Sequence, residues 1–209
     1  MNTKTTLKIE IDAALLHALQ QVAQGIKSNK PISPILVESI DATHTVLVAT
    51  DGCKLVAVKI ETDIQPIFDA FAIPPGAILA MPEKGRITLS LNDGAYTLST
   101  TGSTTGFTPI WGALPKWRKV LPDGAEQVRI LAPADPGYFF YAPVHMTQLS
   151  NTFKAIHSLE EGQLPHIGVR GMALVMWLEE PKITTVAVIM PIRVTPLDAS
   201  EYPTYPDPF

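Results

Sequence analysis

The chain has 209 residues, of which 46% are hydrophobic and 17% charged, and its formal net charge is −4. This length and composition indicate a globular protein with a substantial core and exclude an intrinsically disordered one. The acidic balance argues against a protein that coats nucleic acid with its whole surface, but not against a locally basic face. With a single cysteine, Cys53, no intramolecular disulfide can form, and a reducing, cytoplasmic compartment is expected. No signal peptide and no apolar run of membrane-spanning length is visible, so we expect a soluble protein.

The first part of the chain predicts a strand, a helix and three further strands. Leu7–Ile11 alternates apolar and polar residues as a strand does, and Asp12 is a suitable N-cap for a following helix. Apolar residues then recur at helical spacing from Leu15 to Ile26. Three short β-rich runs follow, at Ile35–Glu38, Thr45–Ala49 and Leu55–Ile60.

The same order begins again in the second part. It contains a strand at Ala70–Ile73, a short helix at Gly76–Met81 ended by Pro82, and a hairpin of Arg86–Leu91 with Tyr96–Thr100. The glycine-rich stretch Gly102–Gly106 is expected to be a loop. A phosphate-binding role is not favoured for it, because no helix clearly follows.

A third copy predicts a strand at Gln127–Leu131, a helix at His145–Leu159, and strands at Met172–Leu178 and Thr184–Ile189. Three imperfect β-α-β-β-β units therefore make up an α+β fold. The break between domains is expected near Pro122–Ala125, and the proline-rich tail is expected to be extended.

Catalytic signatures are missing from the sequence. It has no Gly-x-Ser-x-Gly elbow, no phosphate-binding Gly-x-x-x-x-Gly-Lys and no His-Glu-x-x-His. The histidines are scattered, and a single cysteine excludes a zinc site built on several thiolates. Asp51 could pair with Asp12 or Glu38 as acid and base, but no spacing demands it. We therefore expect neither an enzyme nor a cofactor or metal, with a small α+β enzyme as the minority hypothesis.

Three segments resemble the bacterial DNA polymerase III beta sliding clamp family. Ala49–Leu55 (Ala-Thr-Asp-Gly-Cys-Lys-Leu) resembles the family's Ala-Thr-Asp-Gly-His-Arg-Leu, a motif of its middle domain. Leu114–Pro122 (Leu-Pro-Lys-Trp-Arg-Lys-Val-Leu-Pro) resembles Phe-Pro-Asp-Tyr-Arg-Arg-Val-Leu-Pro. Val188–Val194 (Val-Ile-Met-Pro-Ile-Arg-Val) resembles the terminal Val-Val-Met-Pro-Met-Arg-Leu. Each segment is weak alone, but the three in this order are specific.

The resemblance implies a DNA-clamp fold of three β-α-β-β-β half-units, with antiparallel sheets and helices on one face. Residues 1–122 would form a complete clamp-like domain of two half-units, residues 126–194 half of another, and residues 195–209 the tail. The family's first domain, and the first half of its last domain, are not represented.

In that family the three motifs meet in a cleft that binds short linear peptides of polymerases, clamp loaders and repair proteins. Leu55, Val120, Val188 and Met190 would offer an apolar floor. The alternative for Val188–Met190 is a plain core strand, which we favour for Ile189 alone. The full set implied for the cleft is Ile32, Thr50, Gly52, Leu55, Pro115, Lys119, Val120, Val188, Met190, Pro191, Ile192 and Arg193.

Several substitutions bear on peptide preference. Cys53 replaces a histidine, and Lys116-Trp117 replaces an Asp-Tyr pair. Lys54 and Lys119 replace arginines, and lysine lacks the bidentate fork of arginine.

DNA contact is left open by the sequence. Clamp helices face the DNA and meet its phosphates without reading bases, but a solvated helix face carries the same residues. The candidates are Lys27, Lys30, Lys84, Arg86 and Lys154.

The resemblance implies a homo-oligomer and a role as a processivity or tethering factor. A closed ring in the family has twelve half-units, so three per chain would require four chains or would leave an open partial ring. Self-association through sheet edges is expected in either case. The alternative is a regulator or decoy that captures clamp-binding peptides without encircling DNA. In a variant of it, Tyr202, Tyr205 and Phe209 of the tail would occupy the cleft of the same or a neighbouring chain.

Overall fold

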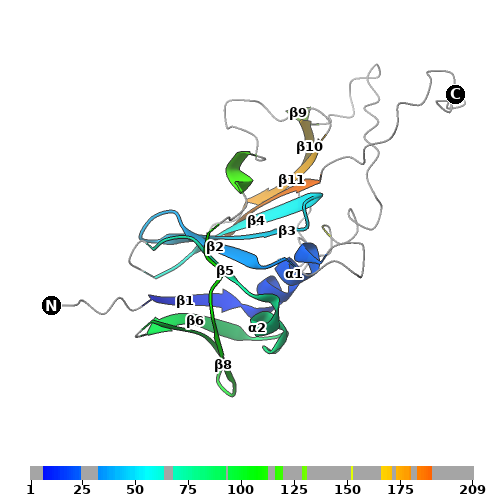
Figure 1. Cartoon of the computed structure of the whole chain (residues 1–209). Helices are drawn as coiled ribbons and strands as arrows, with labels where there is room; N and C mark the ends of the chain where they lie inside the picture. The colour runs from blue at the N-terminus through cyan, green and yellow to red at the C-terminus, as the bar shows by residue number, and fades with distance from the viewer. Residues whose placement is uncertain are drawn as a thin grey trace, which may run out of the picture.

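The computed structural model describes most of the first two units and the strands of the third (Figure 1). The described residues are 7–24, 33–63, 68–92, 94–112, 116–119, 129–130, 152, 166–170, 173–179 and 183–189.

The first unit has the predicted order of elements. Asp12 caps the helix as expected, because its Oδ1 accepts a 2.8 Å hydrogen bond from the Ala14 N–H. Leu15, Leu19 and Val22 are buried, so the helical spacing of apolar residues does mark the packed face. The elements are β1 (Leu7–Asp12), α1 (Ala13–Ala23), β2 (Ile35–Ser39), β3 (His44–Thr50) and β4 (Lys54–Glu61).

The second unit repeats this order and adds a strand where a loop was expected. The loop prediction for Gly102–Gly106 is wrong from Thr104 onward, because Thr104–Phe107 pairs with the preceding strand. This is an edge strand whose threonines and glycine give little apolar alternation. The elements are β5 (Phe71–Ile73), α2 (Pro75–Leu79), β6 (Arg86–Asn92), β7 (Ala95–Ser99) and β8 (Thr104–Phe107), followed by the 3-10 helix η1 (Trp117–Lys119).

The third unit shows four strands, one of which was not predicted. His166–Arg170 is a strand, although Gly168 at its centre weakens the strand pattern. Of the expected helix His145–Leu159, only Thr152 is among the described residues, and it is helical and buried. The strands are β9 (Arg129–Ile130), β10 (His166–Arg170), β11 (Ala173–Glu179) and β12 (Ile183–Ile189).

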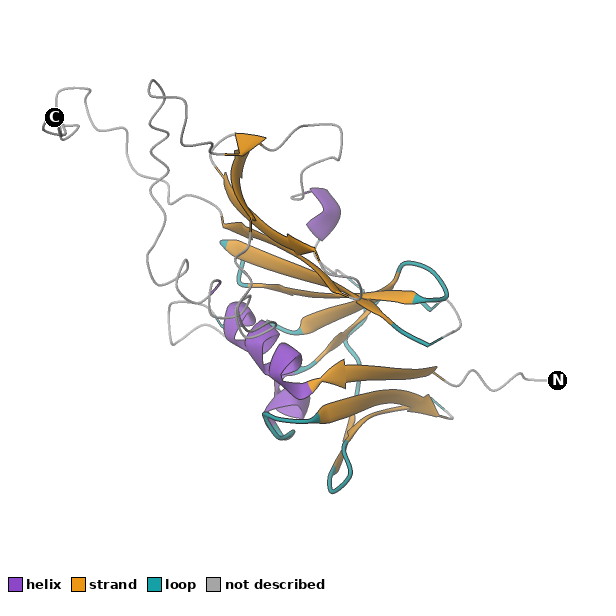
Figure 2. Cartoon of the chain, turned by 180° about the vertical axis from the view of Figure 1, so that it is seen from behind, coloured by secondary structure: helices purple, strands orange, loops and turns teal. Residues whose placement is uncertain are grey.

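These strands form two sheets in which every named pair is antiparallel (Figure 2). The first sheet has the order β1-β6-β7-β8, and the second has the order β5-β2-β3-β4-β12-β11-β10-β9. The third unit thus continues the second sheet through the β4–β12 pair. The predicted α+β class with antiparallel sheets is confirmed.

The first two units exchange their first strands. β1 pairs with β6 of the second unit, and β5 pairs with β2 of the first unit. Their helices α1 and α2 lie next to each other in Figure 1, and both contribute to one main core. The first two units are therefore one interlocked structure and not two adjacent ones.

The second sheet is apolar on both faces. Alternate residues of a strand point to opposite faces, and Val56 and Val58 of β4 face α1 in the main core. Leu55 and Ala57 of the same strand face away from α1, and we call that side the outer face. A second apolar group, the outer cluster, lies there and consists of Leu36, Val46, Val48, Leu55, Ala57 and Trp117.

Candidate functional site

The β3–β4 turn carries the first resembling segment, and its conformation is fixed by its own polar side chains. Asp51 Oδ1 accepts hydrogen bonds of 2.9 Å from the N–H groups of both Cys53 and Lys54. The Thr50 hydroxyl donates to the Lys54 carbonyl at 2.7 Å, and the Gly52 N–H donates to the same hydroxyl oxygen at 3.1 Å. Gly52 has a φ of +89°, which favours glycine. Thr50 and Gly52, both candidates for the cleft, therefore shape this turn.

Leu55 and Val188 of the first and third segments are direct cross-strand neighbours. The register of β4 and β12 pairs Leu55 with Val188, so both side chains lie on the outer face. Both are buried, at 5% and 1% exposure. Ile189, one residue on, points to the opposite face and is part of the main core, the position favoured for it from the sequence.

Trp117 places the second segment on the same outer face. Its side chain is 7% exposed and belongs to the outer cluster with Leu55. The indole Nε1–H donates a 2.8 Å hydrogen bond to Glu38, and the Arg118 guanidinium pairs with the same carboxylate. Arg118 also lies 4.6 Å from the centre of the Trp117 ring, within cation–π range. The sequence singled out Trp117 only as a substitution, and nothing in it linked Glu38 to this residue.

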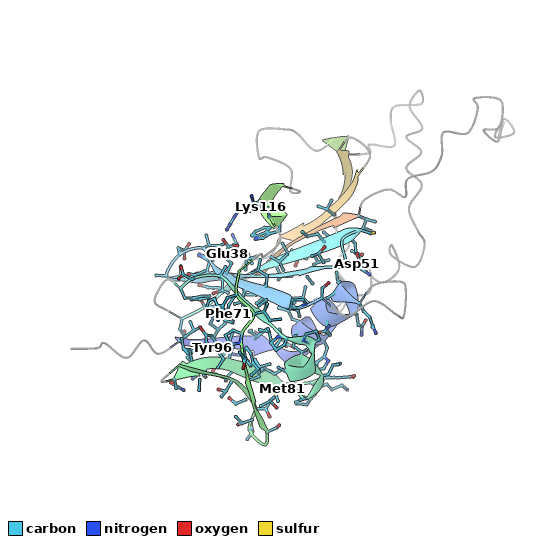
Figure 3. All side chains as sticks on the ribbon, viewed as in Figure 1. Glu38, Asp51, Phe71, Met81, Tyr96 and Lys116 are labelled. Carbon is cyan, nitrogen blue, oxygen red and sulfur yellow. The ribbon has the colours of Figure 1, made fainter. Side chains whose placement is uncertain are left out.

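Parts of all three resembling segments therefore lie on one face of the second sheet. Figure 3 shows Lys116, at the start of the Trp117 region, close to Glu38, with Asp51 well apart near α1. Of the other cleft candidates, Lys119 is described only as part of η1. The remaining candidates lie outside the described residues: Ile32, Pro115, Val120, Met190, Pro191, Ile192 and Arg193.

Lys54 does not contribute a charge to the outer face. It pairs with Ile189 across β4 and β12, so it points toward the main core. Its side chain has no exposed surface, and its Nζ lies 3.4 Å from the Asp51 carboxylate, which is itself 4% exposed. Among the described residues its ammonium group has no hydrogen-bond partner. A peptide on the outer face would therefore not contact the Lys54 side chain, so the effect on peptide preference that we expected from this lysine could not arise from a direct contact.

The carboxylates considered as an acid–base pair have separate partners. Asp12 caps α1, Glu38 accepts from Trp117, and Asp51 holds the β3–β4 turn. No group of three or more histidine, cysteine, aspartate or glutamate residues able to hold a metal occurs in the described part of the chain. Within that part, no helix has the length and apolar character needed to cross a membrane.

Two of the candidate DNA contacts are described, and their settings differ. Lys84 is exposed between α2 and β6. Arg86 is exposed too, but its Nη1 lies 3.0 Å from the Glu10 carboxylate and lowers the pKa of that group, with Lys8 as the second cause. The other three, Lys27, Lys30 and Lys154, lie outside the described residues.

Arg86 lines a hollow that is acidic overall. The hollow lies at the opposite end of β4 from Leu55 and has a volume of about 470 Å³. The charged residues that line it are Lys8, Glu10, Asp12, Glu61, Asp63 and Arg86. Four carboxylates against two cations disfavour a phosphate there. The helix α1 has no lysine or arginine between Ala13 and Ala23.

Comparison with known proteins identifies the fold. No protein-family model matches the chain, and no curated protein matches it by sequence. Among solved structures, the DNA polymerase III subunit beta of Borrelia burgdorferi has a TM-score of 0.63 at 14% identity, over 91% of this chain and 64% of that one. The Helicobacter pylori beta clamp has a TM-score of 0.64 at 11% identity, over 93% of this chain and 68% of that one. The subunit beta of Pseudomonas aeruginosa has a TM-score of 0.61 at 14% identity, over 93% and 68%. The chain thus has the fold of the bacterial DNA polymerase III beta sliding clamps and spans about two thirds of their length.

Proposed function

We propose that this protein is a non-enzymatic, cytoplasmic clamp-like factor that binds short linear peptides of replication and repair proteins at the outer face of its second sheet. One observation carries the proposal: Leu55, Trp117 and Val188, from three distant segments that resemble the peptide-binding motifs of sliding clamps, lie on that single face. The two-sided apolar character of the sheet supports it, because a surface sheet normally needs only one apolar face.

Residues next to the pairing of β4 with β12 would provide the contacts with the peptide. Met190 follows Ile189 directly, at the end of the strand that pairs with Leu55. A methionine adapts its shape to different apolar anchors, as a site for several partners requires. In the proposal, one wall of the peptide site consists of Met190 with Pro191, Ile192 and Arg193. The facing wall contains Ile32, Pro115, Lys119 and Val120.

The test is a titration with a fluorescently labelled short peptide that carries leucine and phenylalanine anchors. Met190→Ala is expected to weaken its binding about 5- to 150-fold, because burying one such anchor is worth about 1–3 kcal/mol. The matched control is Leu79→Ala on α2, where an apolar side chain is 60% exposed and remote from the pairing of β4 with β12. Fluorescence anisotropy measures both. Equal affinity of the Met190→Ala variant and the unaltered protein would contradict the proposed site.

A second candidate is favoured by the charges on the helix side. It is a protein that captures clamp-binding peptides without encircling DNA. Clamps contact phosphates with cations, whereas α1 has none and Arg86 is compensated by Glu10.

Titration of a labelled DNA duplex at low and moderate salt distinguishes the two candidates. The clamp function predicts weak binding that falls as salt rises and that weakens in Lys84→Ala, since losing one phosphate contact lowers the salt slope by about 1. Arg86→Ala is the control, because its charge is already paired and little change is expected. Undetectable binding at low salt, together with intact peptide binding, selects the peptide-capturing protein.

A further inference from the structure

The third unit differs from the first two in where its first strand lies. β1 and β5 each pair with the second strand of the other unit, β6 and β2. β9 instead pairs with β10, the second strand of its own unit. In the described part of the chain, the third unit has no partner unit with which to exchange.

The place that β9 occupies is equivalent to an exchanged place in the complete domain. β5 pairs antiparallel with β2 at the edge of the second sheet, and β9 pairs antiparallel with β10 at the other edge of the same sheet. The place beside β2 is filled by β5, a strand of another unit. The place beside β10 accepts a strand of the same antiparallel orientation, but it is filled by β9, a strand of the same unit.

The pairing that holds β9 is short. Two residue pairs join it to β10, Ile130 with Gly168 and Arg129 with Val169. The exchanged strand in the equivalent place, β5, is short as well, with three residue pairs to β2. A short edge strand contributes few ladder hydrogen bonds, so its replacement by an identical strand costs little.

We propose that two copies of this chain associate by exchanging β9, so that β9 of each copy pairs with β10 of the other. The partner is a second copy because exchange places the same strand, with the same residues, in the same position. The two third units then form one complete interlocked domain, as the first two units do within the chain. The contact is isologous and closes as a dimer. It concerns the β9 edge of the second sheet, whereas the peptide site lies on the outer face, and it does not depend on peptide binding.

Engineered disulfides test the exchange directly, in a Cys53→Ser background that removes the exposed native thiol. Cysteines at positions 130 and 168 (Ile130→Cys with Gly168→Cys) join chains if β9 is exchanged and stay within one chain if it is not. Exchange predicts covalent dimers on a non-reducing gel. The control pair is Glu179→Cys with Thr184→Cys, neighbours on β11 and β12, which should cross-link only within the chain.

A second pair guards against a local effect of replacing Gly168. Arg129→Cys with Val169→Cys occupies the adjacent register and should give the same covalent dimer. The proposal is overturned if both pairs yield only internally linked monomers, or no link while the control pair forms. A dimer seen by light scattering together with internal links would mean self-association through another edge. That result would reject the strand exchange and leave the proposed clamp-like function intact.

Discussion

Replacing Asp51 by alanine is expected to lower the free energy of unfolding by about 3–5 kcal/mol, the cost of leaving a buried charge without its partner. Lys54 has no exposed surface, and Asp51 is the one described residue that forms an ion pair with it, at 3.4 Å. The same substitution removes the acceptor for the N–H groups of Cys53 and Lys54. Urea unfolding followed by far-ultraviolet circular dichroism measures the loss.

Two further variants separate the charge from the turn. Asp51→Asn keeps an oxygen that can accept from the backbone but removes the counter-charge, so it should retain a large part of the loss. Adding Lys54→Met to Asp51→Asn removes both charges and preserves the volume of the side chain. This double variant should lie within about 1 kcal/mol of the unaltered protein, because well-packed apolar groups can replace a buried pair at little cost. A double variant no more stable than Asp51→Asn would show that Lys54 does not depend on Asp51.

The burial of Lys54 could have been found in the sequence. Val56, Val58 and Ile60 face the main core, and Lys54 is in phase with them along β4. The resemblance drew attention to the Asp-Gly turn as a binding loop, where a lysine is expected to be solvated. The alternation of the strand was the better guide, because β4 begins at Lys54 itself.

The local elements were predictable because local chemistry sets them. Asp12 before an apolar helical pattern gave the start of α1, and Pro75 stands in the first turn of α2. β8 was missed because its threonines and Gly106 give little apolar alternation, and β10 was missed because a glycine at its centre disfavours a strand. These strands depend on pairing with β7 and β11, and such contacts between distant residues leave little trace in a short window of sequence.

The assembly of the outer face needed the structure for a related reason. The resemblance of the three segments to the family's motifs implied that they meet, but a one-residue change of register would have exchanged Val188 for Ile189 on that face. The exchange of β1 and β5 between units is likewise a property of the whole domain. The ion pairs of Arg86 with Glu10 and of Arg118 with Glu38 join residues far apart in sequence, and no sequence motif predicts them.

Truncating Trp117 is the second substitution with a large expected effect. Trp117→Ala should lower the free energy of unfolding by about 3–5 kcal/mol, because it leaves a cavity in the outer cluster and removes the hydrogen bond to Glu38. Trp117→Phe keeps a ring in the outer cluster and loses the indole hydrogen bond. Its expected cost is about 2 kcal/mol, because the lost hydrogen bond runs to a carboxylate. Urea unfolding again provides the measurement.

Trp111 supplies the matched control for Trp117. It is also a tryptophan after β8, but it is 52% exposed, and the centre of its ring lies 5.7 Å from that of Phe71 and 6.0 Å from that of Tyr96. Trp111→Ala should therefore cost clearly less than Trp117→Ala, since much of its surface is already in water. Equal losses would mean that Trp117 does not fix η1 to the second sheet. Part of the second segment would then be free to leave the face that Leu55 and Val188 share, and the proposed peptide site would lose one of its walls.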